Sequence, residues 1–179
     1  MKRLLLTVCL FPMILFGQEI KFMGLNLNSN LDSFCKELEK KGLKKVVDRF
    51  EEKEFIGTFA TYDSCRIYVT ATEVSKKIKR VEVAFNAKND KIKRDKIFDE
   101  LIQQYSNKYK SKLKKIAQDP KNNPLNITSY IVSTDNASIR INKFGPGLFL
   151  NTSSLNILYD NLLEIDNNEK NPNRYSNDI

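Results

Sequence analysis

Residues 30–43, NLDSFCKELEKKGL, predict a helix that is defined at both ends, and the rest of the chain is interpreted outward from it. The polar run Asn28-Ser29-Asn30 supplies the N-cap, and Asp32 stands in the first turn, where the helix dipole favours a carboxylate. Gly42 can take the left-handed conformation that ends a helix. The apolar residues recur at helical spacing and form one stripe that faces a core: Leu31, Phe34, Cys35 and Leu38.

The spacing of apolar residues changes to two after this helix. Val46-Val47 and residues 55–60 predict two strands. Residues 65–71 and 81–85 alternate strictly between apolar and polar side chains, which is typical of antiparallel strands with one face on a core and the other in water. Residues 20–27, ahead of the helix, alternate more weakly and predict a further strand.

A second amphipathic helix is predicted over residues 91–115, followed by strands over 127–134, 137–142 and around 155–159. The order of helix, strands, helix, strands predicts an α+β fold. We expect an antiparallel sheet of about five to seven strands with two main helices packed on one face. Each helix precedes about three strands, an order compatible with a structural duplication.

The N-terminus predicts an export signal. Lys2 and Arg3 precede an apolar run from Leu4 to Phe16, which is long enough for a signal-peptide core but short of the roughly 20 residues of a membrane span. We therefore expect cleavage after Gly17, a single domain over residues 18–166, a polar tail over 167–179 and no transmembrane segment in the mature chain. The mature protein is expected in the periplasm or outside the cell.

The amino-acid composition excludes several classes of catalytic and metal-binding site. The chain has no histidine, which excludes Ser-His-Asp and Cys-His catalysis and histidine-ligated metal sites. The six glycines form no phosphate-binding loop. We therefore expect no enzyme, no metal and no cofactor, although a hydrolase built on carboxylates or a Ser-Lys pair remains an alternative. Without Lys2 and Arg3, 28 basic residues face 22 acidic ones, so the mature net charge is 28 − 22 = +6.

Cys35 and Cys65 remain after cleavage, both on predicted core faces. An even number of cysteines in an oxidising compartment favours a disulfide between them, which would close a loop of about 30 residues and stabilise the fold by roughly 3–4 kcal/mol. Two buried thiols are the second interpretation, and a reactive thiol is the third.

Residues 76–115 carry fourteen basic and five acidic side chains. One interpretation is a surface for polyanions, centred on five lysines: Lys108, Lys110, Lys112, Lys114 and Lys115. The other is the solvated face of a strand and a helix. Tyr105 and Tyr109 stand on the apolar stripe and are not free for base stacking, and export also argues against nucleic acid as the partner.

Several segments together resemble a family of small exported proteins of Bacteroides-type bacteria with no established function. They include Ile20-Lys21-Phe22-Met23-Gly24, Asn30-Leu31-Asp32-Ser33-Phe34, Lys41-Gly42-Leu43-Lys44, Phe55-Ile56-Gly57-Thr58-Phe59-Ala60, Cys65-Arg66-Ile67-Tyr68-Val69 and Leu158-Tyr159-Asp160-Asn161. The order of elements is also loosely similar to β-lactamase-inhibitor-protein-like modules. The resemblance implies an envelope or secreted module that binds another envelope or extracellular protein. In the family a longer helix follows the last strand, whereas here Leu162 to Asp166 soon gives way to the polar tail.

Overall fold

The computed structural model describes residues 19–87, 90–109, 112–116, 126–145 and 155–169. The predicted signal peptide, residues 117–125 with Pro120 and Pro124, and residues 170–179 of the predicted tail lie outside these ranges. Residues 167–169 belong to a C-terminal helix, α3 (Leu162–Glu169), so this part of the predicted tail is helical.

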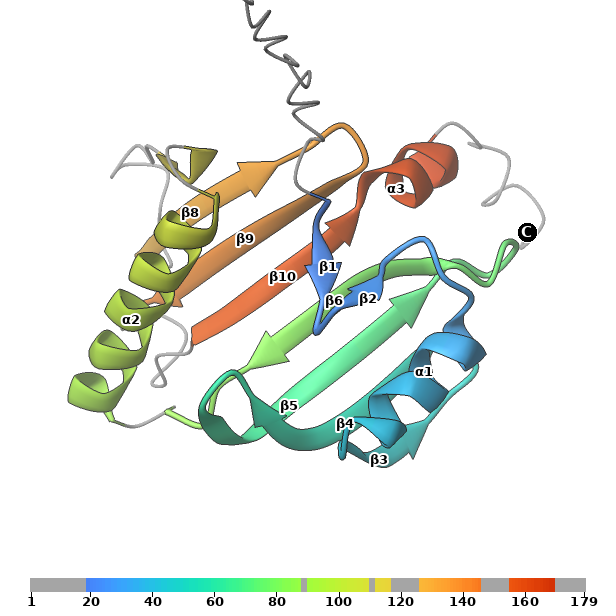
Figure 1. Cartoon of the computed structure of the whole chain (residues 1–179), viewed down its shortest axis with the longest axis horizontal. Coiled ribbons are helices and arrows are strands. Elements are labelled where there is room, and N and C mark those ends of the chain that lie inside the picture. The colour runs from blue at the N-terminus through green and yellow to red at the C-terminus, as the bar shows by residue number, and fades with distance from the viewer. Residues whose placement is uncertain (1–18, 88–89, 110–111, 117–125, 146–154, 170–179) are drawn as a thin grey trace, which may run out of the picture.

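The molecule is mixed α and β, as predicted, and is dominated by one antiparallel sheet (Figure 1). The sheet has eight strands, more than the five to seven expected, in the order β3-β4-β5-β6-β10-β9-β8-β7. Their bounds are β3 (Lys44–Asp48), β4 (Glu52–Phe59), β5 (Tyr62–Ala71), β6 (Ile78–Ala84), β7 (Lys114–Ile116), β8 (Ile127–Ser133), β9 (Ala137–Phe144) and β10 (Leu155–Asn161).

The extra strand comes from the end of the second predicted helix. This helix, α2 (Lys91–Tyr109), ends six residues earlier than expected, and Lys114–Ile116 form β7. Lysine and leucine are good helix formers, so local propensity favours continuing the helix. In the fold these residues pair instead with Ser129–Ile131 of β8, and tertiary pairing overrides the local preference.

The first helix, α1 (Leu31–Lys40), forms as predicted. The side chain of Asn30 accepts a hydrogen bond from the backbone N–H of Asp32 at 3.0 Å, and Gly42 has a positive φ of 88°. Each of α1 and α2 is followed by four consecutive antiparallel strands instead of three, and the last strands of the two sets, β6 and β10, pair at the centre of the sheet.

The N-terminal segment is a small hairpin and not the single strand predicted over residues 20–27. Its strands are β1 (Lys21–Phe22) and β2 (Leu25–Asn26). Met23 and Gly24 between them have φ values of 49° and 82°, and two successive positive φ angles are typical of the tight turns that favour hairpins.

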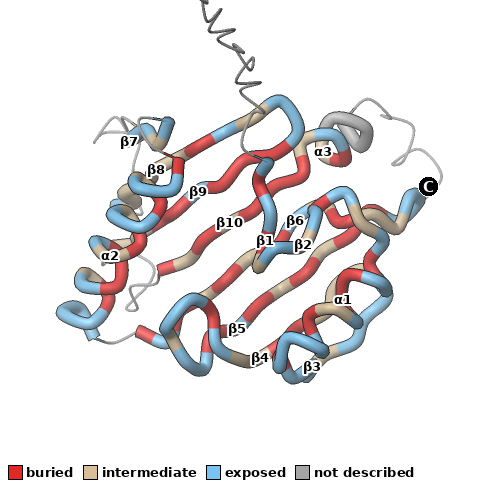
Figure 2. The backbone as a smooth tube through the Cα atoms, in the orientation of Figure 1, coloured by how far each residue is buried: buried red, intermediate tan, exposed pale blue. Residues whose placement is uncertain are grey.

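In Figure 1 the hairpin, α1 and α2 are seen in front of the sheet. Phe22 of β1 is fully buried and stacks with Phe34 of α1, with ring centroids 6.3 Å apart, and lies 5.0 Å from Tyr159 of β10. Tyr105 of α2 forms a hydrogen bond with the same Tyr159. The core therefore lies between these elements and the alternating buried residues of the strands (Figure 2).

Candidate functional site

The other face of the sheet carries polar side chains, and neither α1 nor α2 lies on it. On β5, Arg66 is exposed and Tyr68 half-buried, while their neighbours Cys65, Ile67 and Val69 are buried on the helix side. The strands alternate as the sequence predicts for this region. We refer to this surface as the open face.

A groove of about 620 Å³ lies on the open face near the end of β6. This volume is within the range of sites for small molecules or short peptide segments. The residues that line it belong to β4, β5, β6, β10 and the segment that follows β6, namely Ile56, Ser64, Arg66, Tyr68, Glu82, Ala84, Phe85, Asn86, Leu155 and Asn156.

A chain of hydrogen bonds across four strands positions Glu82 in this groove. Ser129 Oγ donates to Asn142 Oδ1 at 2.8 Å, and Asn142 Nδ2 donates to Asn156 Oδ1 at 3.1 Å. Asn156 Nδ2 in turn donates to Glu82 Oε1 at 2.7 Å. Each side chain in this series of hydrogen bonds donates to the next one. The series therefore ends on the carboxylate of Glu82 and fixes its position.

Two arginines on the open face are bound to carboxylates. Arg66 Nη1 donates to Glu54 Oε1 at 2.5 Å, and Arg80 Nε donates to Asp160 Oδ1 at 2.5 Å. Hydrogen bonding to Glu54, the Coulombic attraction of this carboxylate and a further hydrogen bond with Tyr68 raise the pKa of Arg66. The guanidinium groups are therefore neutralised locally by acids on neighbouring strands.

A second hollow of about 340 Å³ adjoins the groove and shares Ser64, Phe85 and Asn86 with it. Ser64 has a φ of 56°, a conformation that L residues adopt rarely and that is enriched at binding sites. At this hollow Tyr62 donates a hydrogen bond to Glu100 of α2. Burial and this bond raise the pKa of Tyr62 to about 12.

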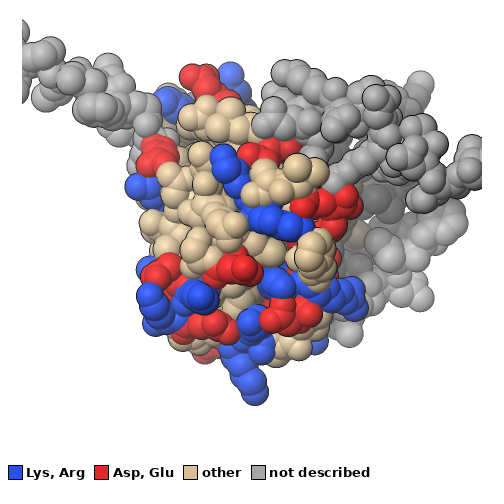
Figure 3. All heavy atoms as spheres, turned by 90° about the vertical axis from the view of Figure 1, so that its right-hand side faces the viewer, with Lys and Arg blue, Asp and Glu red and all other residues tan. Residues whose placement is uncertain are grey.

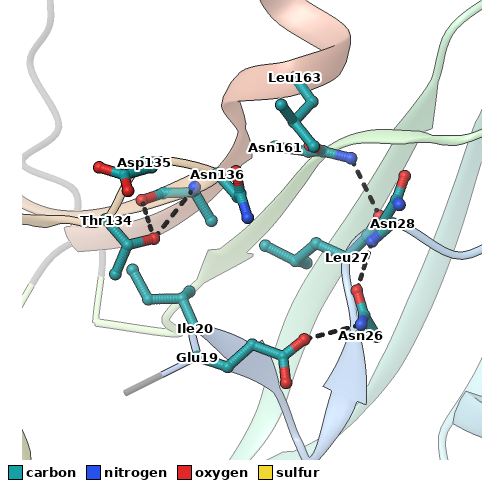
Figure 4. A pocket seen from close by; sticks show the side chains of 11 residues that line it. Glu19, Ile20, Asn26, Leu27, Asn28, Thr134, Asp135, Asn136, Asn161 and Leu163 are labelled. Carbon is teal, nitrogen blue, oxygen red and sulfur yellow. Dashed lines mark hydrogen bonds between the residues drawn. The ribbon is translucent and has the colours of Figure 1, made fainter. Parts of the chain in front are cut away.

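A third cavity, of about 270 Å³, lies between the N-terminal hairpin, the β8–β9 turn and α3 (Figure 4). Asn26 Nδ2 donates to Glu19 Oε1 at 2.7 Å, and Asn161 Nδ2 donates to the carbonyl oxygens of Leu27 and Ile78. In Figure 4 the carboxylate of Asp135 points away from that of Glu19, so the two acids do not converge. The Asn161 amide joins the segment after the hairpin to the sheet and the Asn26 amide holds Glu19 within the N-terminal segment, so both have structural roles.

The predicted disulfide is not formed. Cys35 and Cys65 are both free and buried. The Cys65 thiol donates a hydrogen bond to the carbonyl oxygen of Tyr62 at 3.3 Å, beside the β4–β5 turn. Both cysteines belong to the buried core, so helical and strand spacing correctly placed both of them inside.

Neither thiol has the environment of a reactive cysteine. Burial raises the pKa of Cys35 to about 12 and raises that of Cys65 as well. The positive charges of Lys53 and Lys45 lower the pKa of Cys35 but do not offset its burial. The second interpretation of the sequence, two buried and inert thiols, therefore describes the structure.

The lysines predicted to form an anionic-ligand surface are divided among different elements. Lys108 lies in the last turn of α2, Lys112 in the connection that follows, and Lys114 and Lys115 on β7, while Lys110 lies outside the described residues. Lys114 pairs with Ile131 and Lys115 with Tyr130, so successive side chains of β7 point to opposite faces of the sheet.

Other basic residues of the 76–115 stretch have partners of their own. Lys77 lies 3.8 Å from Glu164 and Lys96 lies 3.9 Å from Glu100. Lys76 stands over the ring of Phe50, with its Nζ 3.4 Å from the centroid. Because these basic residues lie on different elements and several have partners of their own, the stretch is not one continuous basic surface. Figure 3 shows the side of the molecule away from α2, where basic and acidic residues are interspersed.

The groups whose pKa is raised by burial are thiols and phenols, not a pair of acids in a cleft. The part of the chain described by the structure has no cluster of three or more acidic, cysteine or histidine side chains that could hold a metal ion. Within that same part, none of the helices has the length and apolarity that crossing a membrane requires.

Sequence reasoning placed Arg66, Tyr68 and Glu82 on a water-facing strand surface but did not identify them as a site. The alternation along each strand indicates the face of a side chain, and the register between strands decides which side chains meet. Comparison of the chain with protein-family models, with curated proteins and with solved structures found no match in any of the three. The site is therefore interpreted from its own geometry.

Proposed function

We propose that this protein is an exported, non-enzymatic binding module that holds another envelope or extracellular protein in the groove on its open face. The observation that carries the proposal is the groove itself, in which the polar side chains are already held in place. Glu82 is fixed by Asn156, and Arg66 by Glu54. Preorganised polar groups beside apolar walls bind a partner with little loss of side-chain entropy.

Site-specific photocrosslinking in the native envelope fraction tests this proposal. Benzoylphenylalanine in place of exposed Asn86 reports on the groove, and the same residue in place of exposed Gln103 on α2 is the matched control. We expect one protein to be crosslinked from the groove position and not from the helix position. Equal crosslinking from both positions, or none from the groove, would contradict the proposal.

The crosslinked protein, once purified, allows a quantitative test. Ala84→Phe adds a ring to the groove, whereas Gln103→Phe adds the same ring to α2. We expect Ala84→Phe to weaken binding at least about tenfold, which corresponds to 1.4 kcal/mol, and Gln103→Phe to leave it unchanged.

Export is a separate part of the proposal and rests on residues 1–17. Intact-mass measurement on the protein recovered from the envelope or medium should give a chain that starts at Gln18. A chain that keeps Lys2 and Arg3 in the cytoplasmic fraction would contradict export while leaving the groove proposal standing.

A further inference from the structure

We infer that Tyr68 and Glu82 form a binding site for a basic side chain, an arginine or lysine, that the partner protein inserts into the groove. The inference rests on the proposed function and specifies its chemistry. It follows from comparing the two neighbours of Tyr68 in the sheet, Glu54 and Glu82. Glu54 already binds the guanidinium group of Arg66.

Tyr68 stands between two carboxylates on the open face. In the register of the sheet, Glu54 of β4 lies opposite Tyr68 on one side and Glu82 of β6 on the other. The side toward Glu54 is occupied by Arg66, which forms an ion pair with Glu54. An acid next to a tyrosine thus already binds a guanidinium in this protein.

The side toward Glu82 has the same two groups but no cation. Within the described residues Glu82 accepts a hydrogen bond from Asn156 and forms no ion pair. The arginines closest to it along the ladder are Arg66 and Arg80, and both are bound to other acids. Glu82 is therefore the carboxylate of the groove whose charge is left uncompensated.

The groove suits the stem of a basic side chain as well as its charge. Lysine and arginine bury their methylene stems on apolar surface while the charged head reaches a polar group. Ala84, two residues along β6 from Glu82, and Ile56, in the same register row as Ala84, supply apolar surface to the groove. An anionic ligand is disfavoured because Arg66, the cation lining this groove, is already neutralised by Glu54.

Titration followed by NMR tests the inference directly. The probe is N-acetyl-arginine amide, and the matched control is N-acetyl-citrulline amide, which has nearly the same shape but no charge. We expect saturable backbone shifts at residues 66–70, 80–84 and 156 with the arginine probe, and binding about tenfold weaker with citrulline because a charge-assisted hydrogen bond is lost. Equal binding of the two probes, or no binding of either, would overturn the inference.

Variants of the site identify the carboxylate. Glu82→Gln should weaken binding of the arginine probe about tenfold, whereas Asp63→Asn, which removes an acid from the adjoining hollow, should not. Glu54→Gln should also weaken binding, since Arg66, released from its partner, becomes free to turn to Glu82. The double variant Glu54→Gln/Arg66→Gln should then restore binding. Unchanged binding in Glu82→Gln, or no restoration in the double variant, would count against the site.

The tests distinguish a failure of the basic-side-chain site from a failure of the proposed protein-binding function. A partner that is crosslinked from the Asn86 position and binds Glu82→Gln with wild-type affinity would leave the binding module standing and refute the basic anchor. Binding of the arginine probe without any groove-specific crosslinked partner would support the anchor and refute the protein-binding function.

Discussion

The hydroxyl groups of Tyr105 on α2 and Tyr159 on β10 are hydrogen-bonded to each other in the core. Tyr159 is 3% exposed and Tyr105 is 9% exposed, and burial raises the pKa of both phenols. The pair joins the second helix to the central strand of the sheet. It satisfies two polar atoms that would otherwise be costly at this depth.

We expect Tyr159→Phe to lower the free energy of unfolding by about 1–3 kcal/mol, because the Tyr105 hydroxyl is left buried without its partner. The double variant Tyr105→Phe/Tyr159→Phe should be closer to wild type than the sum of the two single variants, since it leaves no unpaired hydroxyl. Urea denaturation of the four proteins measures this coupling. Strictly additive effects would show that the hydroxyl pair contributes no coupling.

Alkaline pH should destabilise the fold through Cys35 and Tyr62. Burial raises the pKa of Cys35 from 9.0 to about 12, and burial and Glu100 raise that of Tyr62 from 10.0 to about 12. Since the folded state favours the protonated forms, their contribution is complete below about pH 9. It decreases as pH rises from 9 toward 12. Urea midpoints between pH 8 and 11 measure the effect, and a midpoint that stays constant or rises would contradict it.

The same burial predicts slow labelling of the thiols. Iodoacetamide at pH 9 should modify Cys35 and Cys65 far more slowly in the native protein than in urea, because the thiolate is the reactive form. Peptide mapping after denaturation without reductant should find both thiols alkylated. A peptide pair linked by a disulfide would contradict the structure.

Asn30 should contribute measurably to stability through α1. Asn30→Ala removes the acceptor for the Asp32 N–H and should cost about 1 kcal/mol. Asn107→Ala, at an exposed position inside α2, is the matched control and should be neutral or slightly stabilising, since alanine is the better helix former. Equal losses in the two variants would rule out a specific capping effect.

Replacing three of the exposed lysines should test the polyanion alternative. The triple variant Lys108→Gln/Lys112→Gln/Lys115→Gln should fold normally, with each substitution changing stability by no more than about 0.5 kcal/mol. Because these lysines lie on different elements, we expect no loss of attachment to an anionic glycan or lipid surface. A variant that folds but no longer attaches would favour polyanion binding over the groove.

The spacing of apolar and polar residues along the sequence predicted an element correctly where neighbouring residues alone define that element. The first helix has its cap and apolar stripe within residues 30–43, and alternation identifies most strands of the sheet. The same spacing predicted the wrong element where the structure depends on contacts with residues distant in the sequence. Lys114–Ile116 form a strand because β8 is there to pair with, and residues 20–27 turn back at Met23-Gly24 into a hairpin.

For the candidate site, too, some features follow from the sequence and others only from the tertiary structure. The sequence alone determined that Arg66, Tyr68 and Glu82 lie on the face opposite the buried residues, because successive side chains of a strand point to opposite faces. Only the tertiary structure decided that Tyr68 stands between Glu54 and Glu82 and that Arg66 turns to one of them. At Tyr68 the pairing joins residues that are 14 positions apart on either side, and its register is set by packing of the whole core, which no local spacing records.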